Sequence, residues 1–379
     1  MSSELIPLLQ AGIYIIIGII FLLVLLYIYL MRPKSAPKEK EHNEVLDDNA
    51  SQEKKKDFIN AFYQILNENQ CVVESIKKDD EYVALYATKR DGEVVSIPLL
   101  RLVESQNEIT ILMGLMSQLI NQAIESRATK IIIEEVSLRE KHREVLYRFG
   151  FLNREGKLQK LILRGNVTKA QLSQYCMDNN VQIDVPDLNN DIRLFEFERF
   201  LFPLKISDLN IPCYVIPIKP KWAQELFDTK EAGSMLFGVD ITRLWNVENV
   251  YYRSARTLTE VVPARILWYV SADKHYSRNK GIVATSYLEE VITGLPKDLF
   301  RKFKHYGIYK WEDIYKLCGA DINKPIRAIR FGHTEVFNSI VPYNDLQKIM
   351  GKKNTFQSPV EVSEEVFNEI YKLKDVKRL

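Results

Sequence analysis

Residues 130–165 read KIIIEEVSLREKHREVLYRFGFLNREGKLQKLILRG, and the order of patterns in this stretch decides the fold class. The opening KIIIEEV predicts a short buried strand, and the charged LREKHREVLYRFG predicts a helix that ends at Gly150. The apolar positions of GKLQKLILRG predict a further strand. A strand, a helix and a second strand in this order predict a domain of mixed helices and strands.

The residues before this stretch add a hairpin and a long helix. EYVALYATKR and GEVVSIPLLRLV have the pattern of strands, and the Asp91-Gly92 pair at their junction is typical of a tight turn. ILMGLMSQLINQAIESR predicts an amphipathic helix, and FINAFYQIL predicts a shorter one. We therefore predict an α+β domain over residues 57–165.

The segment EVLYRFGF in this domain resembles the GNAT family of N-acetyltransferases, as does the order of the predicted elements. Residues 146–151, LYRFGF, take the place of the family's LYEKxGF-like signature. The resemblance implies acetyl-CoA as the cofactor and Tyr147 as the general acid that protonates the departing thiolate. It also implies that the backbone near residues 97–101 polarises the thioester carbonyl. The alternative for Tyr147 is a place in the core.

The family's second mark is a phosphate-cradling turn, R/Q-x-x-G-x-G/A, just before the long helix. In this chain the turn falls on residues 107–114, NEITILMG, which lack that signature. Glu108 also brings a negative charge to the place of a diphosphate. A degenerate, non-catalytic acetyltransferase fold is therefore the alternative to an enzyme. The positions that the resemblance assigns to cofactor binding are Thr110, Ile111, Leu112 and Gly114.

After a connecting segment at residues 166–204, the chain changes to short apolar strands separated by polar turns. The strands are predicted at YVIPI, ARILWYV and GIVATSYLEEV, and helices are predicted at WAQELF and DLFRKFKHYG. This mixture predicts a small β-barrel with helices at its ends over residues 205–379.

The same segment resembles the PUA-like superfamily, in its ASCH and EVE branch. The stretches IPIKPKWAQELF, NVYYRS with PARILWYVSADK, GIVATSYLEEV, and IRAIRFGHTEVF with PVEVSEEVFNEIY carry the resemblance. It implies a cleft that binds RNA or a modified nucleotide through stacking aromatic and basic side chains. The alternative is that the aromatic residues face the core and the charges are merely solvated. The implied contacts are Trp222, Tyr252, Arg253, Arg256 and Lys280, with Lys297, Arg301, Lys302 and Lys304 on a later helix.

The N-terminal residues 5–31 contain no charged side chain and predict a single membrane-spanning helix. Basic residues follow this run at once, from Arg32 to Lys40, and predict that the remaining chain lies on the cytoplasmic side of the cell (inner) membrane. A cleaved signal peptide and a buried core helix are the alternatives. Residues 32–56 are dense in charge and predict a flexible linker.

The composition gives little further guidance on function. The net charge of +2 is close to balance, so nucleic-acid binding requires a local basic patch. His275, His305 and His333 are widely separated and predict neither a metal site nor a catalytic site. The four cysteines have no metal-ligand spacing and predict no disulfide framework. They are Cys71, Cys176, Cys213 and Cys318.

The predicted fold class is thus α+β, with one transmembrane helix, a GNAT-like mixed α/β domain and a PUA-like β-barrel domain. The first functional hypothesis is a membrane-anchored, acetyl-CoA-dependent N-acetyltransferase whose second domain binds RNA or a modified nucleotide. The second is a non-catalytic, membrane-tethered nucleic-acid-binding protein with a degenerate acetyltransferase fold. A third is a pair of domains that contact proteins only. No metal is expected.

Overall fold

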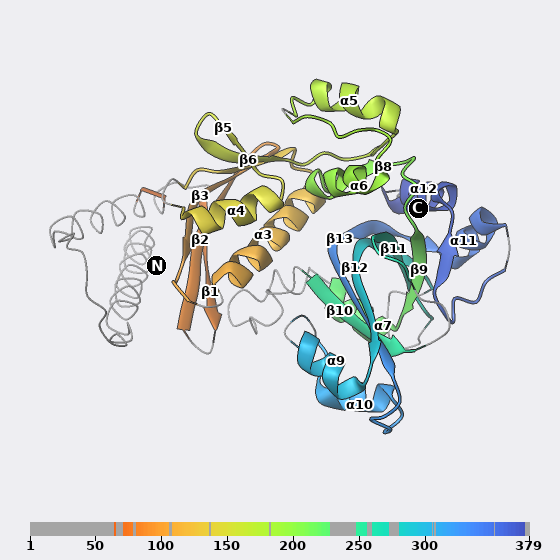
Figure 1. The fold of residues 1–379 in the computed structure, drawn as a ribbon. Coiled ribbons are helices and arrows are strands. Elements are labelled where there is room, and N and C mark those ends of the chain that lie inside the picture. The colour runs from red at the N-terminus through yellow and green to blue at the C-terminus, as the bar shows by residue number, and fades with distance from the viewer. Residues whose placement is uncertain are drawn as a thin grey trace, which may run out of the picture.

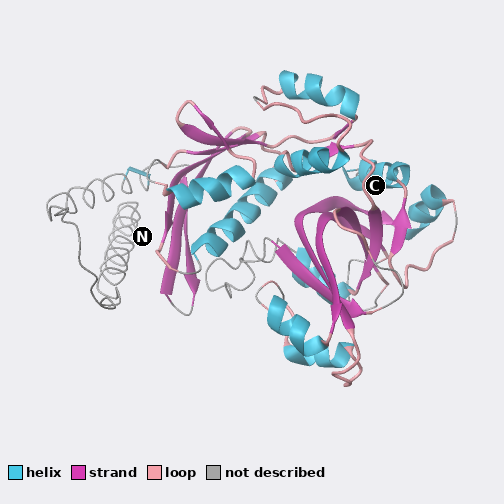
Figure 2. Cartoon of the chain, viewed as in Figure 1, coloured by secondary structure: helices cyan, strands magenta, loops and turns pink. Residues whose placement is uncertain are grey.

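Two six-stranded sheets, each with its own hydrophobic core, make up most of the computed structural model (Figures 1 and 2). The structure describes residues 64–65, 71–78, 81–105, 108–135, 138–181, 183–227, 248–255, 260–272, 280–304, 306, 308–351 and 353–375.

The first sheet has the strand order β1-β2-β3-β4-β6-β5. Its strands β3 and β4 run parallel, whereas the other neighbouring pairs are antiparallel. Helices α3 and α4 lie side by side over this sheet (Figure 1). The elements are β1 (Cys71–Lys78), β2 (Glu81–Asp91), β3 (Val94–Leu102), α3 (Glu108–Glu125), β4 (Lys130–Ile133), α4 (Glu140–Arg148), β5 (Leu152–Arg154) and β6 (Lys157–Leu161).

The long helix α3 supplies much of the first core. Its buried side chains Ile111, Leu115 and Leu119 recur every four residues and so form one apolar stripe toward the sheet. The predicted hairpin, long helix and buried strand are confirmed. The chain also leaves α4 at Gly150, as predicted, with a φ of +83° that a glycine adopts without steric cost.

The connecting segment adds a helix that the sequence analysis did not predict. Helix α6 begins after Asn190, whose side chain accepts a hydrogen bond from the backbone N–H of Arg193. Its side chains Leu194 and Phe195 are buried in the same core as α3, so this segment belongs to the first packing unit. The elements are β7 (Asn166–Val167), α5 (Lys169–Asp178), α6 (Asp191–Phe200) and β8 (Lys205–Ile206).

The second sheet has the order β10-β13-β12-β11-β9-β14 and is covered on both faces. Successive side chains of β11 point to opposite faces: Trp268 packs under α7 and α9, and Tyr269 packs under α11 and α12. The elements are β9 (Cys213–Ile218), α7 (Pro220–Phe227), β10 (Glu248–Ser254), β11 (Ala264–Val270), β12 (Gly281–Gly294), α9 (Pro296–Phe303), α10 (Trp311–Leu317), β13 (Ile326–Pro342), α11 (Tyr343–Met350), β14 (Val360–Val362), α12 (Glu364–Lys372) and the 3₁₀ helix η2 (Leu373–Asp375).

The predicted small β-barrel is not closed among the described strands. The edge strands β10 and β14 each pair with one neighbour only, β13 and β9 respectively, so the described part of the sheet stays open. Register shifts along β12 and β13 interrupt their pairing at three places, and such bulges bend the strands that carry them. The result is a curled open sheet.

The predicted transmembrane helix is also corrected. Within the described ranges, no helix is both long enough and apolar enough to cross a membrane. The predicted span at residues 5–31 and the predicted linker at residues 32–56 lie outside those ranges. The fold class that the structure gives is a mixed α+β fold, and the predicted inner-membrane localisation and membrane partner have no support in it.

Candidate functional site

The parallel strands β3 and β4 separate after four paired residues. Residues 94–97 pair with residues 130–133, and the N–H of Glu134 then donates to the carbonyl oxygen of Ile97 over 3.0 Å. From Pro98 to Leu102, β3 has no described ladder with β4. This is the place where the GNAT resemblance requires a thioester to enter and a backbone N–H to polarise its carbonyl.

A buried carboxylate occupies that place. Oε2 of Glu135 accepts a long hydrogen bond of 3.5 Å from the N–H of Leu100, and it lies 2.6 Å from Nη1 of Arg101. An N–H group stabilises an acyl-transfer transition state when it faces the oxygen that gains negative charge. Here it faces a charge of the protein's own, so this arrangement is not an oxyanion hole.

A second buried carboxylate, that of Glu108, occupies the N-terminus of α3. Glu108 is the first residue of the helix and is only 1% exposed. Its Oε2 lies 2.7 Å from Nζ of Lys141, and its Oε1 contacts Arg139 and His142. Burial and the positive charges of Arg139 and Lys141 lower the pKa of His142 to about 4, so the neutral ring donates to Glu108. The positive helix end is thus compensated internally.

The positions predicted to bind the cofactor all lie inside α3. Thr110 is exposed in the first turn, whereas Ile111, Leu112 and Gly114 are buried. Because the helix begins at Glu108, these residues are helical and do not form a turn before it. The described residues therefore do not fit a diphosphate cradle: its place holds a carboxylate and the following positions face the core.

Tyr147 is the next-to-last residue of α4 and is 37% exposed. Its neighbours Leu146 and Phe151 are fully buried in the first core. Tyr147 is therefore not a core residue, and its assignment as a proton donor stays a prediction.

Of the aromatic residues predicted to contact nucleic acid, Trp222 is half-buried and Tyr252 is buried. The ring of Trp222 lies 4.1 Å from that of Tyr309, and Nζ of Lys221 lies 4.1 Å from the centre of the Trp222 ring. The hydroxyl of Tyr252 donates to the carbonyl oxygen of Leu299 over 3.4 Å. Trp222 is thus partly accessible, with Tyr309 and Lys221 against its ring, whereas Tyr252 is packed inside.

Arg253, another of the predicted nucleic-acid contacts, is buried in an ionic cluster. Its guanidinium pairs with Glu260, and Nη1 of Arg327 lies 3.0 Å from the other oxygen of the same carboxylate. Both arginines and Glu260 are buried. In this arrangement Arg253 neutralises an internal charge instead of facing a phosphate.

The structure does not bring Lys280 close to Arg253. Lys280 precedes the first residue of β12 and lies over the ring of Tyr343 at 4.3 Å. Arg253 lies beside Arg327, which donates to Thr293 near the other end of β12. A strand of this length separates its ends by roughly 40 Å, less where it bends. The fifth predicted contact, Arg256, lies outside the described residues.

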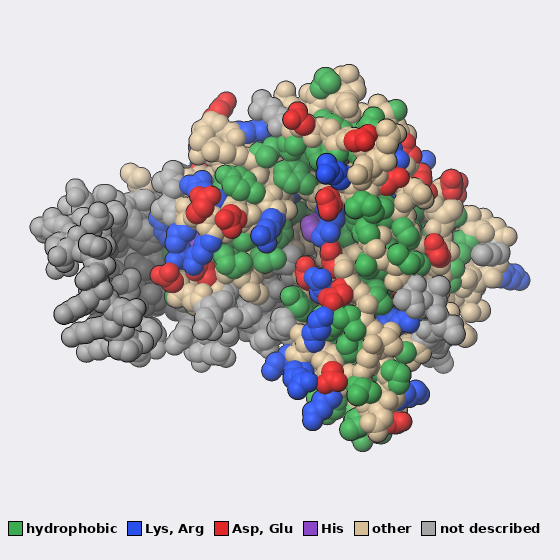
Figure 3. Space-filling view, in the orientation of Figure 1, with side chains coloured by type: hydrophobic (Ala, Val, Ile, Leu, Met, Phe, Trp, Pro, Cys, Tyr) green, Lys and Arg blue, Asp and Glu red, His purple; other side chains and the backbone are tan. Residues whose placement is uncertain are grey.

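A basic surface covers α9 and lies at the same end of the second sheet as Trp222. Figure 3 shows the Lys and Arg side chains gathered over this helix. Phe300 of α9 contacts Trp311 of α10 at 5.5 Å, and Asp313 of α10 lies 3.4 Å from Nζ of Lys221. The exposed basic residues are Lys297, Arg301, Lys302 and Lys304.

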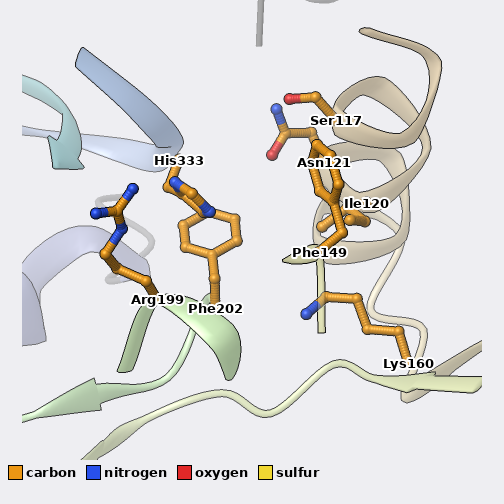
Figure 4. A pocket seen from close by; sticks show the side chains of 8 residues that line it. All are labelled: Ser117, Ile120, Asn121, Phe149, Lys160, Arg199, Phe202 and His333. Carbon is orange, nitrogen blue, oxygen red and sulfur yellow. The ribbon is translucent and has the colours of Figure 1, made fainter. Parts of the chain in front are cut away.

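A small pocket lies between the two sheets, and sequence reasoning missed it. It combines side chains of α3 and β6 with others from α6 and β13 (Figure 4). One signal for it was present: Leu158, Lys160 and Ile162 alternate along β6 and beyond it, so Lys160 falls on a buried face. Nothing in the sequence pairs Lys160 with His333. The lining residues are Ser117, Ile120, Asn121, Phe149, Lys160, Arg199, Phe202 and His333.

No protein-family model matches the chain, and no curated protein matches it in sequence. Solved structures that are similar include the ASCH protein of Zymomonas mobilis, which is 15% identical, covers 42% of this chain and 94% of its own, and has a TM-score of 0.33. The aminoglycoside 6'-N-acetyltransferase of Enterococcus faecium is 14% identical, with coverages of 34% and 97% and a TM-score of 0.24.

A third similar structure is the N-terminal domain of Staphylothermus marinus McrB, at 14% identity, coverages of 42% and 93%, and a TM-score of 0.27. The similar structures thus include an ASCH domain and acetyltransferases, each aligned with part of this chain. Similarity at this level establishes no activity, substrate or partner.

Proposed function

We infer that this chain is a nucleic-acid-binding protein in which the surface of α9 and Trp222 binds single-stranded RNA. In this proposal the acetyltransferase-like part serves as a scaffold and performs no acyl transfer. The observation that carries the proposal is the exposed basic face of α9 at the same end of the sheet as the half-buried Trp222.

The physical basis is a combination of stacking and phosphate contacts. Stacking of a base on an aromatic side chain contributes about 1–3 kcal/mol and depends little on sequence. Lysine and arginine side chains add a term that weakens as salt rises, because bound counterions are released from the phosphates. Trp222 supplies the first contribution, and Lys297, Arg301 and Lys304 supply the second.

The two internal carboxylates favour a scaffold over an enzyme. Glu135 faces the N–H of Leu100, where a thioester carbonyl belongs, and Glu108 lies at the N-terminus of α3, where a diphosphate belongs. Both negative charges oppose the negative charge of the cofactor or of its transition state. Acetyl-CoA binding therefore requires both side chains to move.

Fluorescence anisotropy of a labelled single-stranded RNA tests the proposal on the full chain. We expect binding that weakens steeply between about 50 mM and about 200 mM salt, and weaker binding of duplex RNA of the same sequence. Single-stranded DNA in the same titration distinguishes RNA from single strands in general. Absence of binding at the lower salt concentration contradicts the proposal.

Calorimetric titration with acetyl-CoA separates the two functional hypotheses. We expect no saturable heat at millimolar ligand, because the two carboxylates occupy the required positions. Saturable binding that free coenzyme A competes away restores the acetyltransferase hypothesis, whatever the result with RNA.

A further inference from the structure

The pocket between the two sheets is independent of the proposed RNA surface. Ser117 and Asn121 reach it from one face of α3, one helical turn apart, and His333 reaches it from β13 of the second sheet. Figure 4 shows Arg199 and His333 on one side of this space, and Ser117, Asn121 and Lys160 on the other. In Figure 3, His and basic side chains are visible in the groove between the two parts.

Lys160 is the most unusual member of the pocket, because its side chain is only 1% exposed. Its amino group makes one described hydrogen bond, to the carbonyl oxygen of Phe200 at 3.3 Å, although an ammonium carries three donors. Gly150 makes room for it: a Cβ atom there would lie 2.9 Å from Nζ. Lys160 therefore has donor capacity that no described protein group uses.

His333 provides a second unused polar group. Its Nδ1 atom is buried and has no hydrogen-bond partner among the described residues. The ring is held between Phe202 and Tyr287, each with its ring centre 5.5 Å away. A buried polar atom without a partner costs free energy, which a bound ligand removes.

The charges around the pocket are unbalanced. Arg199 lines it and pairs with Glu289 at 2.7 Å, and this is the one carboxylate described in contact with a lining side chain. Lys205 lies over the rings of Phe202 and Tyr287 and donates to the hydroxyl of Tyr287, and the negative charges of Glu198 and Glu335 act on it. Burial and the positive charges of Arg199, Lys160 and Lys205 together lower the pKa of His333 to about 3. The local field is thus positive.

We propose that this pocket binds a small oxyanion, a carboxylate or phosphate group, through Lys160, His333 and Arg199. The anion supplies the missing acceptor for the amino group of Lys160 and balances the positive field. Ser117 and Asn121 contribute neutral hydrogen bonds from α3. Because these residues come from both sheets, the anion also bridges the two parts of the protein.

Burial lowers the pKa of Lys160 to about 7 in the empty pocket, and an anion favours the protonated form. Binding is therefore coupled to uptake of a proton by Lys160. Above that pKa the affinity falls by close to tenfold for each pH unit. With a pKa lowered to about 3, His333 is neutral over this pH range in the empty pocket.

Calorimetry on the full chain with inorganic phosphate or acetate tests the proposal, against chloride at matched ionic strength. We expect saturable binding in the unaltered protein and at least tenfold weaker binding in Lys160→Met. Lys157→Met is the matched control, since Lys157 lies on the same strand with a half-exposed side chain. Equal binding in all three proteins, or heats that never saturate, overturns the proposal.

The pH dependence is measured with acetate, which stays ionised above about pH 6 because carboxyl groups titrate near 4. We expect at least tenfold tighter binding at pH 6.5 than at pH 8.5. If Lys160→Met does not fold, His333→Asn replaces it, since asparagine tolerates the positive φ of this position. An affinity that is independent of pH in the unaltered protein overturns the assignment to Lys160.

Discussion

The amino group of Lys160 lies 3.3 Å from the carbonyl oxygen of Phe200, directly over Gly150. This relationship joins three segments: strand β6, the end of α6, and the turn that ends α4. The turn belongs to the LYRFGF stretch that carries the acetyltransferase resemblance. In this protein the glycine also has a packing role, because it lets the connecting segment approach the first sheet.

Replacing Gly150 with alanine should therefore destabilise the fold. A Cβ atom would lie 2.2 Å from the carbonyl oxygen of Phe200, and the φ of +83° adds backbone strain. We expect a loss of more than about 2 kcal/mol in the free energy of unfolding, measured in urea. Gly156→Ala is the control, because its φ is +80° and nothing lies within 4 Å. Equal losses in the two variants contradict the packing role.

The stability of the unaltered protein should rise with pH relative to Lys160→Met. Burial lowers the pKa of Lys160 from 10.5 to about 7, so the unfolded chain binds more protons than the folded chain between these values. The cost of burying Lys160 is full below pH 7 and fades as pH approaches 10.5. We expect Lys160→Met to be more stabilising at pH 6 than at pH 10 by several kcal/mol.

Urea unfolding in buffers free of phosphate and carboxylate measures this difference, since a bound anion would mask it. Lys157→Met should show no such trend, because its side chain is half-exposed. Suppose instead that the free energies of unfolding of Lys160→Met and of the unaltered protein differ by the same amount at every pH. Lys160 is then charged in the folded state, and other groups compensate its charge.

Glu198 should be essential for joining α6 to the second sheet. This buried carboxylate lies 3.2 Å from Nε of Arg265, and it accepts hydrogen bonds from the hydroxyl of Tyr287 and the N–H of Ile206. Glu198→Gln leaves the buried Arg265 without its counter-charge, so we expect a loss of about 3–5 kcal/mol.

The urea midpoint of Glu198→Gln is compared with that of Glu196→Gln, an exposed position on the same helix. A loss below about 0.5 kcal/mol in both variants, as is usual at surface positions, contradicts the predicted role of this ion pair.

Glu108→Ala should create a new anion site at the N-terminus of α3. The substitution removes the carboxylate that Arg139, Lys141 and His142 surround. We expect inorganic pyrophosphate to bind this variant, and to bind the unaltered protein more weakly at that position. Pyrophosphate binding of equal strength in the two proteins shows that Glu108 does not block the helix end.

Local patterns predicted several elements of the first sheet correctly, because their determinants lie close together in the sequence. Gly150 ends α4 through its own backbone conformation, and the apolar stripe from Ile111 to Leu119 fixes the buried side of α3. Closure of the second sheet depends on whether β10 and β14 meet, which strand periodicity does not encode. That is why an open sheet was mistaken for a barrel.

The candidate site was harder to predict, because its contacts join distant residues. Arg253 has the side-chain chemistry of a phosphate ligand, but it pairs with Glu260, a carboxylate that Arg327 from distant β13 also contacts. Likewise, Lys160 and His333 share a pocket only after two sheets pack together. Glu108 was visible in the sequence as a charge unsuited to a diphosphate, whereas its basic partners on α4 were not.

Photocrosslinking is the most direct test of RNA binding at α9 and Trp222. A labelled single-stranded RNA is irradiated with the full chain, and the crosslinked peptides are identified by mass spectrometry. We predict crosslinks within residues 219–227 and 296–311. A triple variant that combines Trp222→Ala, Lys297→Ala and Arg301→Ala should lose these crosslinks. The control variant Lys348→Ala, on α11, should keep them. Crosslinks confined to other surfaces, or unchanged in the triple variant, contradict the claim.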